Sequence, residues 1–219
     1  MAQPYSVVGK DGTESVLYAF GGVAANDGNQ PQAGLIMDGS GNLYWTTTIG
    51  GMSCVYQRLG CGTVFKISSD STETILHEFG NNDTQFPQSA LVFDKNNNLL
   101  GTTQNGAMYK IAPDGTETIV IASLGGYYAS NLVQDRSGNF YGTTGTGGDP
   151  ERCKSNLPGC GLVFKVGSDG VETVLHTFNG RVRFPLGVTL YNGVLYGTAG
   201  GGSKNCGAKG CGTVFSVKK

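Results

Sequence analysis

Charged side chains are scarce in this sequence: Asp, Glu, Lys and Arg make up 14 % of its 219 residues. An ordinary globular domain has roughly 25 %, so the surface must be made polar by Gly, Asn, Ser and Thr, residues that also form turns. The formal net charge is −1, and no dense block of Lys and Arg occurs. Because contacts of such blocks with phosphates supply most non-specific affinity for nucleic acids, the composition argues against a nucleic-acid partner.

Long apolar runs and helical patterns are also missing. No apolar run approaches the roughly 20 residues that span a bilayer, so membrane insertion is not expected. The first residues, Met1–Pro4, contain no apolar signal core, so export would require a signal that has already been removed. No window sustains the i, i+3, i+4 spacing of an amphipathic helix, which favours an all-β fold.

One phrase of the sequence returns four times. It is Gly-Asn-Leu-Tyr-Trp-Thr-Thr at residues 41–47, and its copies lie at 97–103, 138–144 and 193–199. The matching positions Leu43, Leu99, Phe140 and Leu195 are separated by 56, 41 and 55 residues. A four-stranded propeller blade takes ~40–50 residues, so this period predicts a β-propeller.

Each copy lies among three further strand-like runs rich in Val, Ile, Thr, Tyr and Phe and bounded by turn residues. We name the four runs of a repeat strands a, b, c and d in chain order; strand b carries the phrase. The a runs are 34–38, 90–94, 131–135 and 187–191; the c runs are 63–67, 107–111, 162–166 and 213–217; the d runs are 13–20, 72–79, 116–123 and 171–178.

The repeats predict a single domain over residues 1–219, a four-bladed propeller of four-stranded antiparallel blades. Its repeats cover approximately 31–79, 87–123, 129–178 and 185–219. The last repeat ends at strand c, so we expect residues 12–20 to supply its strand d and close the ring, which removes an open sheet edge. Residues 4–12 have no place in this scheme, although 8–12 resemble 166–170 at the end of a c run.

The six cysteines form three local pairs, all in loops between strands b and c. The pairs are Cys54/Cys61, Cys153/Cys160 and Cys206/Cys211. The second repeat has a short b–c connection without cysteine. Because each pair accompanies a long loop, the pattern favours disulfides, which need an oxidising compartment. Zinc binding is the alternative, but the spacing differs from that of zinc half-sites, so no metal or cofactor is predicted.

His77 and His176 occupy one strand-d position that Tyr18 and Ile121 fill in other repeats, which is typical of packing. The repeated Glu14, Glu73, Glu117 and Glu172 are expected far apart around the ring. Paired catalytic carboxylates lie within ~5–10 Å of each other, so a structural role is favoured for these glutamates.

The motifs of the first repeat, Asn42–Thr47, Gly50-Gly51, Gly60–Ile67 and Thr72–Phe79, resemble the GloVer tandem repeat of exported bacterial proteins of the choice-of-anchor kind. The resemblance covers nearly the whole chain. It departs from the family at Trp45, which replaces a glycine, and in the second repeat, which lacks the cysteine loop. It implies export and surface attachment, and it brings no catalytic residues.

Loop lengths indicate where a ligand would bind. The a–b and c–d turns are minimal, whereas the b–c and d–a connections, which share the other face, vary in length; variable loops on a rigid scaffold often carry the binding site. Trp45 is either a sugar-stacking residue or part of the blade core. The further candidates are Asp27, Asn29, Gln30, Tyr56, Arg58, Asp83, Gln85, Tyr127, Tyr128, Arg181 and Arg183.

Three functions fit these residues. Aromatic and amide side chains with little charge favour a secreted or surface-displayed module that binds glycan or a surface polymer. One alternative is a structural or protein–protein adhesion module that contacts a surface protein. The other is a hydrolase or lyase with an axial site that draws on Asp27, Asp83, Asp149, Glu151 and the arginines. A monomer without a cofactor is expected.

Overall fold

The structure is a computed structural model that describes residues 10–21, 27–51, 54, 59–81, 84–151, 153, 158–202 and 211–219, and the backbone of 4–8. These residues contain β-strands and turns, and no helix occurs among them. The all-β prediction is therefore confirmed.

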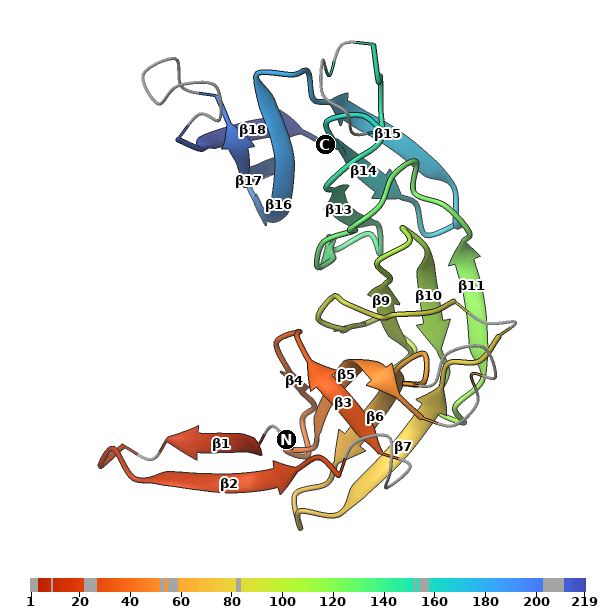
Figure 1. Cartoon of the computed structure of the whole chain (residues 1–219), viewed down its shortest axis with the longest axis vertical. Helices are drawn as coiled ribbons and strands as arrows, with labels where there is room; N and C mark the ends of the chain where they lie inside the picture. The colour runs from red at the N-terminus through yellow and green to blue at the C-terminus, as the bar shows by residue number, and fades with distance from the viewer. Residues whose placement is uncertain are drawn as a thin grey trace.

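Four antiparallel blades follow one another around a central space, so the protein is a four-bladed β-propeller as predicted (Figure 1). Blades 1 to 3 run from an inner strand a to an outer strand d, whereas blade 4 has three strands and ends at strand c among the described residues, so the prediction of four-stranded blades holds for three of the four. Blade 1 has β3 (Gly28–Pro31) and β4 (Ile36–Met37) as strand a, then β5 (Leu43–Gly50), β6 (Thr63–Ile67) and β7 (Glu73–Glu78). Blade 2 has β8 (Val92–Phe93), β9 (Leu99–Thr102), β10 (Met108–Ile111) and β11 (Glu117–Ile121). Blade 3 has β12 (Val133–Gln134), β13 (Phe140–Thr144), β14 (Leu162–Val166) and β15 (Glu172–Thr177), and blade 4 has β16 (Val182–Tyr191), β17 (Val194–Gly201) and β18 (Thr213–Lys218).

The a–b turns are built around an aspartate in blades 1 to 3. Asp38 Oδ1 accepts hydrogen bonds from the backbone N–H groups of Ser40 and Asn42, and Oδ2 accepts one from the Tyr44 hydroxyl. Hydrogen bonds from the Asn42 side chain and these other groups lower the pKa of Asp38 to about 2. Asp94 and Asp135 make the corresponding bonds to their turns. Blade 4 uses the two-residue turn Asn192-Gly193 instead, both at positive φ, as a tight hairpin requires.

The core consists of layers between successive blades. Val64 and Phe79 of blade 1 pack with Leu91, Leu99 and Tyr109 of blade 2. An aromatic residue that follows strand d recurs in these layers, with its ring edge-on to the strand-c aromatic of the next blade. The ring centroids are 5.0 Å apart for Phe79–Tyr109 and 4.9 Å apart for Phe178–Phe215. The blades are thus held together by repeated contacts of one kind.

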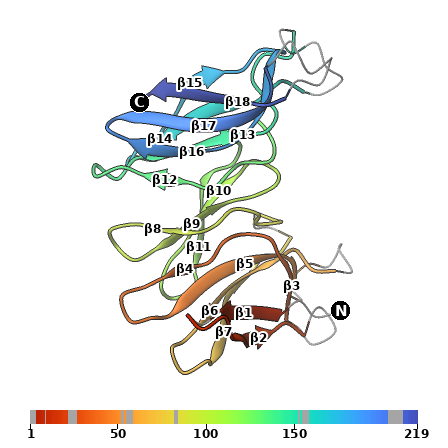
Figure 2. The same cartoon turned by 90° about the vertical axis from the view of Figure 1, so that its left-hand side faces the viewer.

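The predicted ring closure by residues 12–20 is wrong. The N-terminal strand β2 (Glu14–Ala19) pairs with β1 (Pro4–Val8), and β18 pairs only with β17 among the described strands. Figures 1 and 2 place the β1–β2 hairpin and blade 4 at opposite ends of the arc of blades. Pairing across a tight turn costs far less chain entropy than pairing across almost the whole chain.

The β1–β2 hairpin is a c–d hairpin of the repeat. Its register shifts between Tyr5 and Ser6, as that of β6–β7 shifts between Val64 and Phe65. The Phe20 ring lies 5.0 Å from Phe65 of blade 1, which repeats the contact between blades. The similarity of residues 8–12 to 166–170 was the sequence signal for this arrangement, and the closure hypothesis left it unused.

Candidate functional site

Four residues adopt a left-handed backbone at equivalent positions, where each blade begins its strand a. We call them the left-handed residues: Gln30, Phe86, Tyr128 and Phe184, with φ of 57°, 58°, 58° and 53°. Such a conformation is costly for a residue with a side chain and collects at functional sites. Three of the four precede a proline, Pro31, Pro87 or Pro185.

The preceding blade holds these residues in place. The backbone N–H of Phe86 donates to the Cys61 carbonyl at 2.9 Å, and that of Phe184 donates to the Cys160 carbonyl at 3.0 Å. In blade 2, which has no cysteine loop, the N–H of Tyr128 donates to the Gln104 carbonyl at 2.7 Å. The b–c loop of one blade therefore fixes the backbone of the next blade where its inner strand begins.

A cavity of about 380 Å³ opens between the left-handed residues of blades 3 and 4 and the start of blade 2. Its lining is aromatic, aliphatic, amide and hydroxyl, and includes no charged residue. The side chains that line it include Gln88, Ser89, Tyr128, Asn131, Phe184 and Leu186. Gln88 Oε1 is buried and accepts no hydrogen bond from any described residue.

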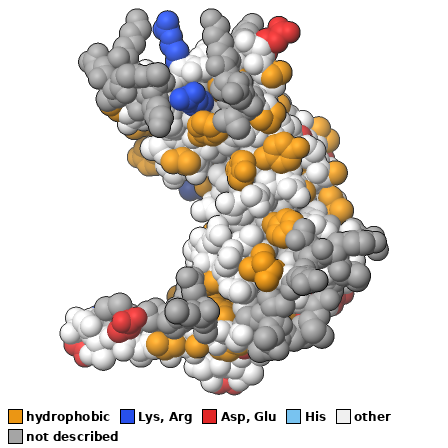
Figure 3. Space-filling model, viewed as in Figure 1, with side chains coloured by type: hydrophobic (Ala, Val, Ile, Leu, Met, Phe, Trp, Pro, Cys, Tyr) orange, Lys and Arg blue, Asp and Glu red, His pale blue; other side chains and the backbone are white. Residues whose placement is uncertain are grey.

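Two aromatic rings line this cavity, of which Tyr128 is exposed and Phe184 is partly buried. Tyr127 and Tyr128 are each 51 % exposed, and Leu186 is 75 % exposed. The Arg183 guanidinium lies 5.9 Å from the Phe184 ring centroid, within the range of a cation–π contact. Figure 3 shows basic side chains at this end of the arc. Of the residues predicted from separate loops, Tyr128 therefore occupies one left-handed position, and Arg183 directly precedes the next one, Phe184.

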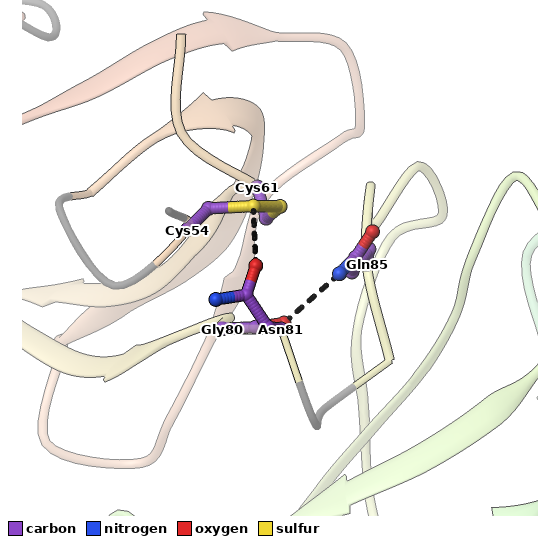
Figure 4. Close-up of a disulfide and its surroundings, with 5 residues drawn as sticks. All are labelled: Cys54, Cys61, Gly80, Asn81 and Gln85. Carbon is purple, nitrogen blue, oxygen red and sulfur yellow. Dashed lines mark hydrogen bonds between the residues drawn. A yellow bond between two sulfur atoms is a disulfide. The ribbon is translucent and has the colours of Figure 1, made fainter. Parts of the chain in front are cut away.

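Two of the predicted disulfides are present, Cys54–Cys61 and Cys153–Cys160, with Cα–Cα distances of 5.6 and 5.3 Å. They indicate an oxidising environment. Figure 4 shows the first disulfide beside Asn81, whose side chain lies 3.8 Å from the Cys54 sulfur. The candidate Gln85 uses its amide to donate to the Gly80 carbonyl at 3.1 Å.

The third predicted pair, Cys206/Cys211, is not confirmed as a pair. Cys211 is disulfide-bonded, but Cys206 lies outside the described residues, so the pairing of these two cysteines stays a prediction. Cys211 directly precedes Gly212 and the first residue of β18, Thr213. The bond at Cys211 therefore lies at the b–c loop of blade 4, the same place that the other two disulfides have in blades 1 and 3.

Trp45 is not a surface residue, so its role as a sugar-stacking candidate is corrected. It is 1 % exposed, and its ring centroid lies 4.2 Å from that of Phe65 and 6.2 Å from that of Phe20. The core alternative holds, because the β1–β2 hairpin covers this face of blade 1.

The predicted candidate Asp27 has a structural role. It is 6 % exposed, and its carboxylate accepts hydrogen bonds from the Tyr18 hydroxyl and from the backbone N–H groups of Gly21 and Gly28. The Tyr18 hydroxyl also lies 2.9 Å from Glu73 Oε2. Burial raises the pKa of Glu73; the Tyr18 hydrogen bond lowers it, and nearby Asp27 raises it further. Burial and the two carboxylates raise the pKa of Tyr18.

The remaining predicted residues are dispersed or undescribed. Arg181 is exposed, and Asp149 accepts the N–H of exposed Glu151 in the b–c loop of blade 3. Tyr56, Arg58 and Asp83 lie outside the described residues. Among the described residues, no three His, Cys, Asp or Glu side chains gather as a metal site would require. They also form no helix that is long and apolar enough to cross a membrane.

Sequence reasoning missed Gln88, Asn131 and Phe184. A signal for them was present, because the four-residue stretch at each left-handed residue recurs in every repeat. It reads Gln-Pro-Gln-Ala at 30–33, Phe-Pro-Gln-Ser at 86–89, Tyr-Ala-Ser-Asn at 128–131 and Phe-Pro-Leu-Gly at 184–187.

The family model of the Gloeobacter/Verrucomicrobia repeat matches residues 4–215. The chain belongs to this repeat family. The suspected GloVer resemblance is confirmed, and the match includes the β1–β2 hairpin as well as all four blades. No curated protein matches the sequence.

Solved structures with the same fold are larger than this member of the repeat family. Virginiamycin B lyase from Staphylococcus aureus matches with a TM-score of 0.60 and 14 % identity, over 96 % of this chain and 61 % of the lyase. A luciferin-regenerating enzyme matches with a TM-score of 0.60 and 13 % identity, over 100 % of this chain and 72 % of that enzyme. A gluconolactonase from Xanthomonas campestris matches with a TM-score of 0.55 and 15 % identity, over 97 % and 71 %. These likenesses establish the propeller fold alone.

Proposed function

We propose that this protein is a secreted or surface-displayed binding module for glycan chains, and that the cavity beside Tyr128 and Phe184 is its binding site. The observation that carries the proposal is the placement of two aromatic rings, exposed Tyr128 and partly buried Phe184, at a cavity whose polar lining groups are amides and hydroxyls. Sugars present apolar ring faces and hydroxyl groups, so they bind to aromatic planes that are flanked by uncharged hydrogen-bonding groups.

The details of the lining support a sugar over a charged ligand. Gln88 and Asn131 contribute amide groups to the lining, and an amide can both donate a hydrogen bond to a sugar hydroxyl and accept one from it. Ser89 lines the same cavity, and its hydroxyl accepts the N–H of Thr102. The strained backbone at Tyr128 and Phe184 fixes both residues before a ligand arrives, which lowers the entropy cost of binding.

Export is proposed on separate grounds. Two disulfides and a repeat that resembles exported proteins support an oxidising, extracellular location. Alkylation of the native, unreduced protein should modify no thiol, and a mass shift at any of the six cysteines would contradict the proposal.

The test of binding is a glycan and polysaccharide array with four proteins: the unchanged chain, Tyr128→Ala, Phe184→Ala and Tyr191→Ala. Tyr191 is a matched control, because it is exposed but lies at the a–b turn of blade 4. We expect signal with the unchanged chain and Tyr191→Ala, and at least tenfold weaker signal with the two cavity variants. An array without signal, or equal loss in all three variants, would overturn the proposal and favour the adhesion alternative.

The enzyme alternative is tested in the same samples. Three of the matched folds carry enzyme names, which makes release of product from a bound polymer the readout to add. Binding without any product over hours supports the binding module, whereas product that disappears in Tyr128→Ala assigns catalysis to this cavity.

A further inference from the structure

Strand β18 leaves one edge of blade 4 unpaired among the described strands. In blades 1 to 3 the corresponding strands β6, β10 and β14 each pair with strands on both sides. Val64 of β6 is fully buried, whereas Val214 at the matching position of β18 is 77 % exposed. An exposed edge with apolar residues is a template for a further strand.

The contacts between outer strands indicate which strand fits there. The Tyr18 hydroxyl on β2 donates to Glu73, at the start of strand d of the next blade. His77 on β7 lies 3.8 Å from Glu117, at the start of the following strand d. At two of the three steps between the described strands d, a polar residue therefore faces the first glutamate of the next strand d; at the third step the corresponding residue is Ile121. His176 on β15 has the position of His77 but is exposed, and blade 4 offers it no such glutamate among the described residues.

Among the described strands, one strand d has a first glutamate that is not opposite a preceding strand d. It is β2, where Glu14 is exposed. Strand β2 now pairs with β1, which places Ser6 opposite Val16. At that position the c strands of all four blades carry an aromatic ring: Phe65, Tyr109, Phe164 and Phe215. By sequence, β18 is therefore a better neighbour for β2 than β1 is.

We propose that two copies of this chain exchange their β2 strands, so that β2 of each copy becomes strand d of blade 4 in the other. Glu14 of each copy then faces His176 of the other, and the two open edges are satisfied together. The exchange removes the β1–β2 pairing over five residues and replaces it with a pairing along β18, which has six. Exchange of an identical element is an inexpensive route to a dimer, and the product has eight blades, within the usual range for propellers.

The first measurement is the mass in solution as a function of concentration, by light scattering after size exclusion. Two chains of 22.8 kDa per particle are expected. The variant Val214→Asp should be a folded monomer, because Val214 is exposed in the single chain and is expected to become buried only in the pair. Glu14→Ala should weaken association about a hundredfold, because the dimer loses two charge-assisted hydrogen bonds, one from each copy. A particle of one chain at every concentration would overturn the proposal.

A cysteine pair locates the strand. Lys66 is opposite Thr74 in blade 1, and the matching residues are Ser216 and Ser15. In the double variant Ser15→Cys/Ser216→Cys we expect oxidation to join two chains, seen as a covalent dimer on a non-reducing gel. The control Val7→Cys/Ser15→Cys joins residues that are opposite in the β1–β2 hairpin. The exchange would be contradicted if the first variant formed its disulfide within single chains or formed a ladder of more than two chains. It would also be contradicted if the control formed its disulfide efficiently and the first variant did not.

Discussion

The backbone N–H of Phe184 donates a hydrogen bond of 3.0 Å to the carbonyl of Cys160. A disulfide-bonded cysteine of blade 3 thereby fixes a left-handed residue of blade 4, next to the candidate cavity. Cys61 and Phe86 repeat the relationship between blades 1 and 2 at 2.9 Å. These two disulfides thus affect more than their own loops, because a cysteine of each one accepts a hydrogen bond from the backbone at which the next blade begins.

Loss of a disulfide should destabilise the backbone at the start of the following blade. Cys153→Ala/Cys160→Ala is expected to lower the free energy of unfolding by about 2.5 kcal/mol in the chain-entropy treatment of a short loop. Hydrogen exchange at the Phe184 amide should become faster in this variant. The Tyr128 amide is the internal control, because it donates to Gln104 in a blade without cysteines. Faster exchange at Tyr128 and Phe184 alike would mean that the loss is global.

Position 62 has no room for a side chain, partly because the next blade packs against it. The φ of Gly62 is +104°, and a Cβ placed on it would lie 2.5 Å from the Thr47 carbonyl oxygen of its own blade and 2.6 Å from Pro87 Cδ of the next blade. Gly62→Ala should therefore lower the free energy of unfolding by more than about 3 kcal/mol, as backbone strain and overpacking add. Gly12→Ala is the matched control, since Gly12 has φ of +81° with nothing within 4 Å, and it should cost about 1 kcal/mol. Chemical denaturation measures both free energies of unfolding, and equal losses would show that crowding by Thr47 and Pro87 has no effect.

The Tyr18 hydroxyl is shared by Asp27 and Glu73, each 2.9 Å away. Tyr18→Phe leaves two partly buried carboxylates without this group, so the free energy of unfolding should fall by about 1–3 kcal/mol at pH 7. Tyr44→Phe removes a comparable hydroxyl from Asp38, which keeps its bonds to Ser40 and Asn42, and should cost less. If chemical denaturation shows the same loss in the free energy of unfolding for both substitutions, sharing of the Tyr18 hydroxyl between two carboxylates contributes no additional stability.

The stability contribution of Glu73 should depend on pH. Burial raises its pKa above the ordinary value of 4.5, which means that the folded protein disfavours the ionised form. The free energy of unfolding should therefore fall as pH rises through the raised pKa, since ionised Glu73 is better solvated in the unfolded chain. Below about pH 4.5 the carboxyl is neutral in both states and the penalty vanishes.

Glu73→Gln is expected to be more stable than the unchanged chain at pH 7, and the difference should shrink to nothing at low pH. Thermal unfolding of both proteins from acid to neutral pH measures it. Glu172→Gln should behave in the same direction, because burial also raises the pKa of Glu172. A difference that is constant with pH would exclude titration of Glu73 as its cause.

The sequence by itself determined the features that depend on neighbours along the chain. The strand runs, the turn chemistry at Asp38 and Asp135, and the pairing of Cys54 with Cys61 all involve residues within one repeat. Alternation of apolar residues and the position of turn formers settle such features locally. The period then gave the number of blades, because each copy of the phrase contributes one strand b.

Only the tertiary structure decided the contacts between blades. Tyr18 meets Glu73, Phe184 meets Cys160, and Trp45 is covered by Phe20, and none of these partners shares a strand or a turn. Two strands can accept the same edge with similar hydrogen bonding, so the pattern of β2 alone could not choose between β1 and β18. That choice depends on chain entropy and on the stacking of whole blades, which local sequence does not encode.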